Sequence, residues 1–190
     1  CTFGSLETRA AKATIQYSDL SSLYIGKMAL VVGCDLDGGS TGGVGIDVDG
    51  HDAHATIYNN RIHDYGMQSL VDITEQCIGI RVRNGGIAEI RNNLIWGCKD
   101  TSGNGTETDC GMGVFVKDGS HAVILGNIIW DCYLYHIGAK VRGDRLIYAP
   151  ASTVVRHNIL KRQGDDNILG GGVTASYTIN ADPKFVGDGD

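Results

Sequence analysis

The segment Ala88-Glu-Ile-Arg-Asn-Asn-Leu-Ile95 decides the fold, because the sequence repeats it. Further copies are Ala55-Thr-Ile-Tyr-Asn-Asn-Arg-Ile62, Ala122-Val-Ile-Leu-Gly-Asn-Ile-Ile129 and Thr153-Val-Val-Arg-His-Asn-Ile-Leu160, with a degenerate copy in Ala13-Thr-Ile-Gln-Tyr-Ser-Asp-Leu20. The recurring asparagines lie 33, 34 and 31 residues apart, at Asn60, Asn93, Asn127 and Asn158. A nearly constant period of this kind indicates a repeat architecture.

A second repeated segment precedes each of these copies. It reads Gly45-Ile-Asp-Val-Asp, Gly79-Ile-Arg-Val-Arg, Gly113-Val-Phe-Val-Lys and Gly138-Ala-Lys-Val-Arg. Its apolar residues recur at every second position, which is typical of a β-strand with one buried face. These positions are Ile46/Val48, Ile80/Val82, Val114/Val116 and Ala139/Val141. A glycine-containing turn joins the two segments of each unit.

A unit of two or three short strands cannot bury its apolar face alone. Units stacked about 4.8 Å apart would pair like strands in parallel and place Ile over Ile in a common core. The asparagines would then form a column whose side-chain amides hydrogen-bond between coils. Leucine-rich repeats, with about 20 to 29 residues per unit, fit less well, and so do propeller blades, which carry four strands and a Trp-Asp signature.

The asparagine-anchored segments and the ending Asn180-Ala-Asp-Pro-Lys-Phe-Val186 resemble the secreted right-handed β-helix proteins of the pectate-lyase-like superfamily. The resemblance implies an all-β solenoid, a right-handed parallel β-helix of about five coils, clearest over residues 45–160. We expect residues 1–190 to form a single domain. We also expect a fragment or processed form of a longer protein, because the sequence begins at Cys1 without Met.

Composition excludes some functions and favours others. The sequence has 16 Lys and Arg against 22 Asp and Glu, a formal net charge of −6, which argues against a general nucleic-acid binder with a basic surface. No apolar run is long enough to span a membrane. The predicted partner is therefore neither a nucleic acid nor a lipid bilayer core.

Six cysteines form an even set without a Cys-x-x-Cys motif, which favours export and disulfide formation. Cys98 aligns with Cys132, and Cys77 aligns closely with Cys110, so disulfides between adjacent coils are predicted. Cys1 and Cys34 remain by elimination. The alternative is a set of reduced thiols that fill the core of a cytosolic protein. The first interpretation predicts an extracellular or cell-surface location.

Charged residues occupy the outward positions of the glycine-led strands. They are Asp47 and Asp49, then Arg81 and Arg83, then Phe115 and Lys117, then Lys140 and Arg142. Arginine forks match carboxylate geometry and a focused positive charge attracts anions, so this strip is a candidate site for uronate or sulfate groups. Phe115 would supply an apolar platform for a sugar face. The alternative is charge pairing between neighbouring strands on a solvated face.

The resemblance implies a candidate reaction for the residues of this strip, the β-elimination of a uronic acid. Lyases of the superfamily use Arg or Lys as the base on an outward strand, often with Ca²⁺ held by acidic residues. By analogy the candidate catalytic residues are Lys117, Lys140 and Arg81, and the candidate Ca²⁺ ligands are Asp47 and Asp49. Two carboxylates are fewer than the six to eight oxygens, roughly, that Ca²⁺ prefers. Substrate-binding candidates are Arg83, Phe115, Arg142, Trp96 and Trp130.

Two further groups of residues are candidates. His51, His54 and His63 lie near Asp52 and Asp64, a composition that can bind Zn²⁺, although His63 is expected on a different side of the coil. Trp96 and Trp130 occupy equivalent positions, as do His63 and Lys161, so these side chains should stack. Longer loops are predicted at Gly66–Gln76, Lys99–Asp109 and Ser21–Gly43, where they could frame a groove or be passive decorations.

Two functions of different classes follow from these features. The first is an extracellular β-helix that binds, and in a lyase-like form cleaves, an anionic polysaccharide along the charged strip. The second is a non-enzymatic structural module, such as a cell-surface stalk, an adhesin or a filament subunit. Uncapped ends of a β-helix expose strand edges that pair with another chain, so the second function also predicts end-to-end self-association.

Overall fold

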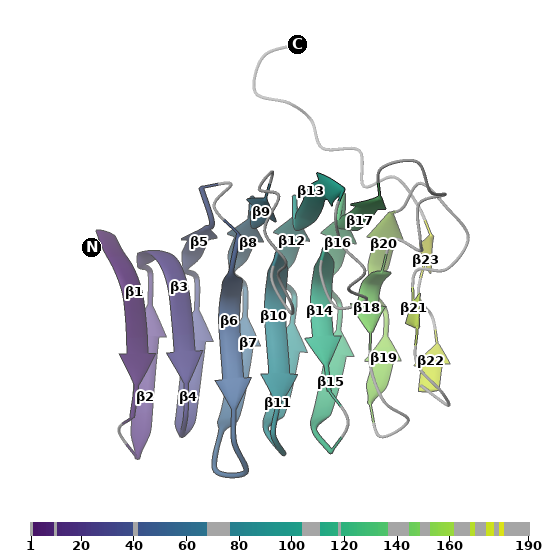
Figure 1. The fold of residues 1–190 in the computed structure, drawn as a ribbon. Helices are drawn as coiled ribbons and strands as arrows, with labels where there is room; N and C mark the ends of the chain where they lie inside the picture. The colour runs from purple at the N-terminus through teal and green to yellow at the C-terminus, as the bar shows by residue number, and fades with distance from the viewer. Residues whose placement is uncertain are drawn as a thin grey trace.

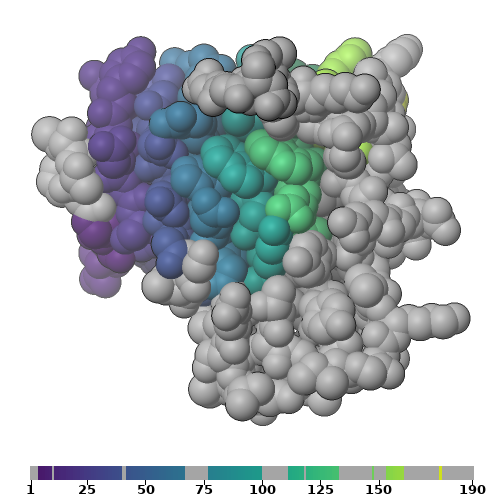
Figure 2. Space-filling view, turned by 90° about the horizontal axis from the view of Figure 1, so that it is seen from above, coloured from purple at the N-terminus to yellow at the C-terminus, as the bar shows by residue number. Residues whose placement is uncertain are grey.

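A computed structural model shows the chain as stacked coils of short parallel strands (Figure 1). It describes residues 2–9, 11–39, 42–67, 77–103, 111–117, 119–136, 145–148, 153–161, 168–169, 174–176 and 179–180. Seen from above, the coils follow one another across the molecule in chain order (Figure 2). In the described part of the chain no helix is long and apolar enough to cross a membrane.

Each full coil contributes one strand to each of three rows. The first row contains β1 (Thr2–Thr8), β3 (Asp19–Ile25), β6 (Val44–Asp49), β10 (Ile78–Arg83), β14 (Met112–Val116), β18 (Arg145–Tyr148) and β21 (Ile168–Leu169). The second row contains β2 (Lys12–Gln16), β4 (Met28–Val32), β7 (His54–Tyr58), β11 (Ile87–Arg91), β15 (His121–Leu125), β19 (Val154–Arg156) and β22 (Thr174–Ser176).

The third row contains β5 (Asp35–Asp37), β8 (Arg61–His63), β12 (Leu94–Trp96), β16 (Ile128–Trp130), β20 (Ile159–Lys161) and β23 (Ile179–Asn180). The long strand β3 pairs with β1, β5 and β6, and so joins the first and third rows into one sheet. A small extra sheet contains β9 (Gly66–Met67), β13 (Lys99–Gly103) and β17 (Tyr133–His136), at the upper edge in Figure 1.

Columns of aliphatic side chains form the core between these rows. The columns are Ile46, Ile80, Val114 and Ile147 from the first row, Ile57, Ile90, Ile124 and Val155 from the second, and Ile62, Ile95, Ile129 and Leu160 from the third. All twelve side chains are fully buried. The parallel in-register stacking that the repeat predicts is therefore confirmed, because each apolar residue lies over its counterpart in the next coil.

The asparagine column is a buried hydrogen-bonded ladder. The Nδ2 of Asn60 donates to Oδ1 of Asn93 at 2.9 Å, and the same bond recurs at 3.0 Å from Asn93 to Asn127 and from Asn127 to Asn158. Each Oδ1 also accepts the backbone N–H of the preceding coil, starting with Cys34 N–H to Asn60 at 2.9 Å. Both polar ends of each buried amide are thus satisfied, as burial demands.

The residue before each ladder position adopts a left-handed backbone. Asn59, Asn92 and His157 have φ of 57°, 51° and 54°, and Gly126 has 67° at the equivalent position. Asn tolerates this region better than most residues, and Gly enters it without strain. The paired Asn-Asn of the repeat therefore has two causes, since the first Asn makes the corner and the second makes the ladder.

The described residues form seven coils, where the sequence predicts about five, because the second row is a seven-stranded sheet. One missed coil lies within Ser21–Gly43, which was interpreted as a loop but contains most of β3 and all of β4 and β5. Its ladder position is Cys34 instead of Asn, so the repeat was not recognisable there. The last coil, with β21, β22 and β23, consists of two- and three-residue strands.

Candidate functional site

The charged strip on the first row is a network of ion pairs. Asp47 accepts bidentate bonds from two guanidinium groups, with Nη2 to Oδ2 distances of 2.7 Å for Arg81 and 2.9 Å for Arg83. The side chains of Asp47 and Arg81 are each only 11% exposed. Bidentate charge-assisted pairs in a partly buried setting fix geometry strongly. The structure thus brings Asp47, Arg81 and Arg83 together, with their charges directed at one another.

Asp49 extends this network on the same face. Its Oδ2 lies 2.9 Å from Nη2 of Arg83, and its Oδ1 accepts a bond from the Asn84 side chain at 2.6 Å. The hydroxyl of Tyr24 donates to Asp49 at 3.4 Å. Partial burial, followed by the charge of Asp49, raises the pKa of Tyr24, so this hydroxyl stays protonated and remains a donor.

These partners bear on the predicted Ca²⁺ ligands. Asp47 and Asp49 face guanidinium groups, which occupy the carboxylate oxygens that a cation would need. The arrangement corresponds to the alternative interpretation, charge pairing between neighbouring strands. It satisfies both carboxylates without a metal and leaves Arg83, 27% exposed, as the more accessible of the two arginines.

Phe115 is not the exposed sugar platform that its position predicts. Its side chain is 2% exposed and packs with Ile78, Met112 and Val44 in a small apolar cluster separate from the main core. This prediction is wrong because the outer face of the first row is partly apolar. Ile78, Met112 and Val44 are in register on neighbouring strands, and Phe115 completes their contacts.

The remaining cations of the strip are placed only in part. Lys117 follows β14, donates its backbone N–H to Val82 O at 2.9 Å, and holds Nζ 6.0 Å from the centroid of the Phe115 ring. Lys140 and Arg142 lie outside the described residues. The described strip therefore runs from the carboxylates of β6 through the guanidinium groups of β10 to the ammonium of Lys117.

The third row carries the predicted aromatic stack. His63 and Trp96 stack with centroids 4.2 Å apart at 6°, and Trp96 and Trp130 stack at 4.9 Å and 13°. Both faces of Trp96 are thus covered by neighbouring rings, so it cannot stack on a sugar. The column confirms the predicted stacking of these three residues. At the next position the backbone of Lys161 pairs with that of Trp130.

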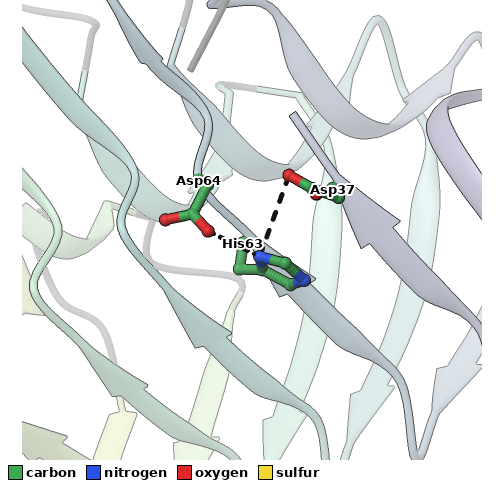
Figure 3. Close-up of side chains that lie close together, drawn as sticks. All are labelled: Asp37, His63 and Asp64. Atoms are coloured by element: carbon green, nitrogen blue, oxygen red, sulfur yellow. Dashed lines mark hydrogen bonds and ion pairs between the residues drawn. The ribbon is translucent and has the colours of Figure 1, made fainter. Parts of the chain in front are cut away.

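Carboxylates surround His63 at one end of this stack (Figure 3). Its Nδ1 lies 2.8 Å from Asp64 Oδ2 and 3.9 Å from Asp37 Oδ1, and its Nε2 lies 3.0 Å from Asp35 Oδ1. The Arg61 side chain pairs with Asp35. Among the described residues, Asp37, His63 and Asp64 are the group whose ligand atoms are close enough to hold one metal ion.

Two of these three residues were predicted from the sequence as candidate metal ligands. The sequence pattern groups His63 and Asp64 with His51, Asp52 and His54, but these lie in the turn after β6 and at the start of β7. It missed Asp35 and Asp37, which lie on β5 in the unrecognised second coil. The register Asp35–Arg61 and Asp37–His63 is the signal that would have found them, had Cys34 been aligned with Asn60.

Cys34, Cys98 and Cys132 are buried free thiols, so the predicted disulfide between Cys98 and Cys132 is not present in the structure. Cys98 and Cys132 precede the paired residues Lys99 and Tyr133 and therefore lie in register on adjacent coils. In-register neighbours hold their Cβ atoms about 4.8 Å apart and parallel, whereas a disulfide requires about 3.8 Å. Cys1 and Cys110 lie outside the described residues.

We expect Cys34, Cys98 and Cys132 to resist alkylation by iodoacetamide at pH 8 and to react once the protein is unfolded. Burial raises the pKa of Cys34 and of Cys98, so a smaller fraction is thiolate than in free cysteine at the same pH. Mass spectrometry of labelled peptides measures this. Recovery of a disulfide-linked Cys98–Cys132 peptide from the native protein would contradict the structure.

Comparisons with known proteins agree with the coil geometry. Neither a search of curated proteins nor a search of solved structures gave a match. A family model described as a right handed beta helix region matches residues 7–185, which is nearly the whole chain. Together with the parallel, in-register coils, this match shows that the chain belongs to the right-handed β-helix family.

Proposed function

We propose that this protein binds an anionic polysaccharide on the outer face of β6, β10 and β14. The proposal is supported by one observation above the others, the order of charges across three neighbouring coils. Carboxylates occupy β6, guanidinium groups occupy β10, and Lys117 follows on the next coil. A partner of this kind implies an extracellular or cell-surface location, which is part of the same proposal.

The pair formed by Arg83 and Lys117 favours an anion. The bond from Lys117 N–H to Val82 O places Lys117 beside Arg83, as Val116 lies beside Val82. Two positively charged side chains side by side at the surface form a local concentration of positive charge, which attracts a carboxylate or sulfate. Arg83 is also pre-oriented by Asp47 and Asp49, so little side-chain entropy is lost when its exposed edge contacts a ligand.

The geometry supports binding more than cleavage. A base for β-elimination must release its proton before it can accept one. Asp47 holds Arg81 in a bidentate pair and thereby stabilises the protonated guanidinium. Arg81 is therefore better suited to positioning than to proton abstraction, and cleavage would fall to Lys117 or Lys140.

The Lys117→Gln variant is expected to weaken binding to a uronate polymer roughly two- to fivefold, because a partly exposed charge pair contributes about 0.5 to 1 kcal/mol. Binding should also weaken as salt is added, since exposed charges are screened. Isothermal titration calorimetry with a uronate polymer, a sulfated polymer and a neutral polymer measures both effects, and absorbance of unsaturated products reports cleavage in the same samples.

The matched control is Lys12→Gln, which removes one lysine from the exposed strand β2 and should leave affinity unchanged. Added Ca²⁺ should change nothing, because Asp47 and Asp49 are paired with arginines. Equal weakening by both lysine variants would indicate a general charge effect and would contradict a site at Lys117.

A non-enzymatic structural module is the second proposal. It is favoured by the mutual pairing of the strip charges and by the covered faces of Trp96. These side chains contact one another, so the repeated residues serve mainly to hold the coils together. If none of the three polymers binds at millimolar concentration, the first proposal is excluded and this one is retained. It predicts concentration-dependent self-association, measurable by analytical ultracentrifugation.

A further inference from the structure

The arrangement around His63 poses an electrostatic problem that the protein must solve. A carboxylate oxygen only accepts hydrogen bonds. Nε2 of His63 lies 3.0 Å from Asp35 Oδ1 and must therefore carry a hydrogen. The other ring nitrogen, Nδ1, lies 2.8 Å from Asp64 Oδ2.

Three carboxylates, Asp35, Asp37 and Asp64, lie around His63, and the Arg61 side chain pairs with Asp35. This pairing leaves an excess of negative charge beside Nδ1, and a divalent ion bound there would offset it. Asp37, His63 and Asp64 each offer one ligand atom close enough to share such an ion.

The orientation of the His63 ring is fixed by two residues that are not candidate ligands, Trp96 and Asp35. Trp96 stacks on it at 4.2 Å and nearly parallel, which fixes the ring plane. Asp35 fixes its rotation and tautomer through Nε2, and Arg61 in turn holds Asp35. A carboxylate that orients the far nitrogen of a ligand histidine is the usual outer shell of a protein metal site.

The outer side of the group is exposed to solvent. The side chains of Asp37 and Asp64 are 59% and 49% exposed, so both carboxylates can turn toward a shared ion. Gly97 lies beside Asp64, where a Cβ would come within 2.6 Å of Asp64 Oδ1. In the described part of the chain, no lysine or arginine forms an ion pair with Asp37 or Asp64.

We infer that Asp37, His63 and Asp64 form a binding site for a divalent transition-metal ion of the zinc class. One imidazole nitrogen and two carboxylate oxygens are a donor set that Zn²⁺ accepts, with a fourth position for water. Asp35 is a positioning residue and does not contact the ion. The site lies on the third row, away from the charged strip, and does not depend on the proposed polysaccharide binding.

Zn²⁺ titration of the full chain against a chromophoric chelator tests the site. We expect one equivalent to bind, and the Asp37→Asn, Asp64→Asn and His63→Phe variants to lower affinity at least about tenfold. His63→Phe keeps an aromatic ring against Trp96, so a loss of binding there reports the nitrogen and not the stack. Asp35→Asn should lower affinity by roughly tenfold through the lost orientation of His63.

The matched control is Asp131→Asn, because Asp131 has the same left-handed corner one coil beyond Gly97 but pairs with Lys99. It should bind Zn²⁺ like the unmodified protein. Co²⁺ spectra supply a second readout, since bound thiolate would add a charge-transfer band that this site should lack. The inference is overturned if Asp37→Asn and Asp64→Asn bind as tightly as the unmodified protein, or if thiolate is the only ligand seen. Failure to bind any Zn²⁺ at neutral pH overturns it too.

Discussion

The Asn93→Ala variant is expected to lower the free energy of unfolding by about 3 to 6 kcal/mol, a large part of the roughly 5 to 15 kcal/mol typical of a folded domain. Asn93 accepts the backbone N–H and the Nδ2 of Asn60, and donates to Ile57 O and to Asn127 Oδ1. Alanine would leave two or three buried polar groups unpaired, at about 1 to 3 kcal/mol each. Chemical denaturation followed by circular dichroism measures the loss.

The adjacent residue supplies the control for this prediction. Asn92 belongs to the same corner, but its side chain is exposed and its φ is 51°. Asn92→Gly keeps the left-handed backbone and should change stability by less than about 0.5 kcal/mol. If Asn93→Ala were as mild as Asn92→Gly, the ladder would be incidental to the fold.

The second large effect is expected at Gly79, the second residue of β10. A Cβ added there would lie 2.6 Å from the backbone O of Gly113 and 2.7 Å from Cγ2 of Ile95. Neither atom is the far end of a flexible side chain, so adjacent coils would have to separate. We expect Gly79→Ala to destabilise the protein by about 2 to 4 kcal/mol, as overpacking of a tight core does.

Gly4→Ala is the matched control, since Gly4 is also in a first-row strand but has no neighbour within 4 Å of the added Cβ. It should be neutral or slightly stabilising, by up to about 1 kcal/mol, because alanine restricts the unfolded chain. Thermal unfolding of the two variants side by side measures the difference. Equal melting temperatures would show that the coils can shift to admit the methyl group.

Much of the fold could be predicted because the same positions of each sequence repeat supply the buried side chains of each coil. The spacing of Asn60, Asn93, Asn127 and Asn158 gave the coil period, and the alternation in the glycine-led strands gave the buried face. The second coil was not predictable in this way. Cys34 replaces Asn at its corner, and only 16 residues separate it from its counterpart Ser18, so the pattern is absent although the strand register is intact.

The candidate sites were harder to predict, because their geometry depends on register between coils. Sequence alternation placed Asp47, Arg81 and Arg83 on one face, and the register between coils then made them ion-pair partners of one another. Phe115 lies in the same alternating pattern but is buried by neighbouring apolar residues. The pattern of one strand does not show which residues of other strands cover it. The group around His63 required Asp35 and Asp37 from a coil that the repeat did not reveal.

The asparagine ladder has a direction, since the side-chain amides of Asn60, Asn93 and Asn127 each donate to the amide of the next coil. Aligned amide dipoles polarise one another, so the column is a head-to-tail chain along the solenoid axis. A deletion or duplication that runs from one ladder asparagine to the next would rejoin donor to acceptor. A cut of any other length would place an amide opposite a foreign side chain. The whole coil is therefore the smallest unit by which such a chain can be shortened or lengthened.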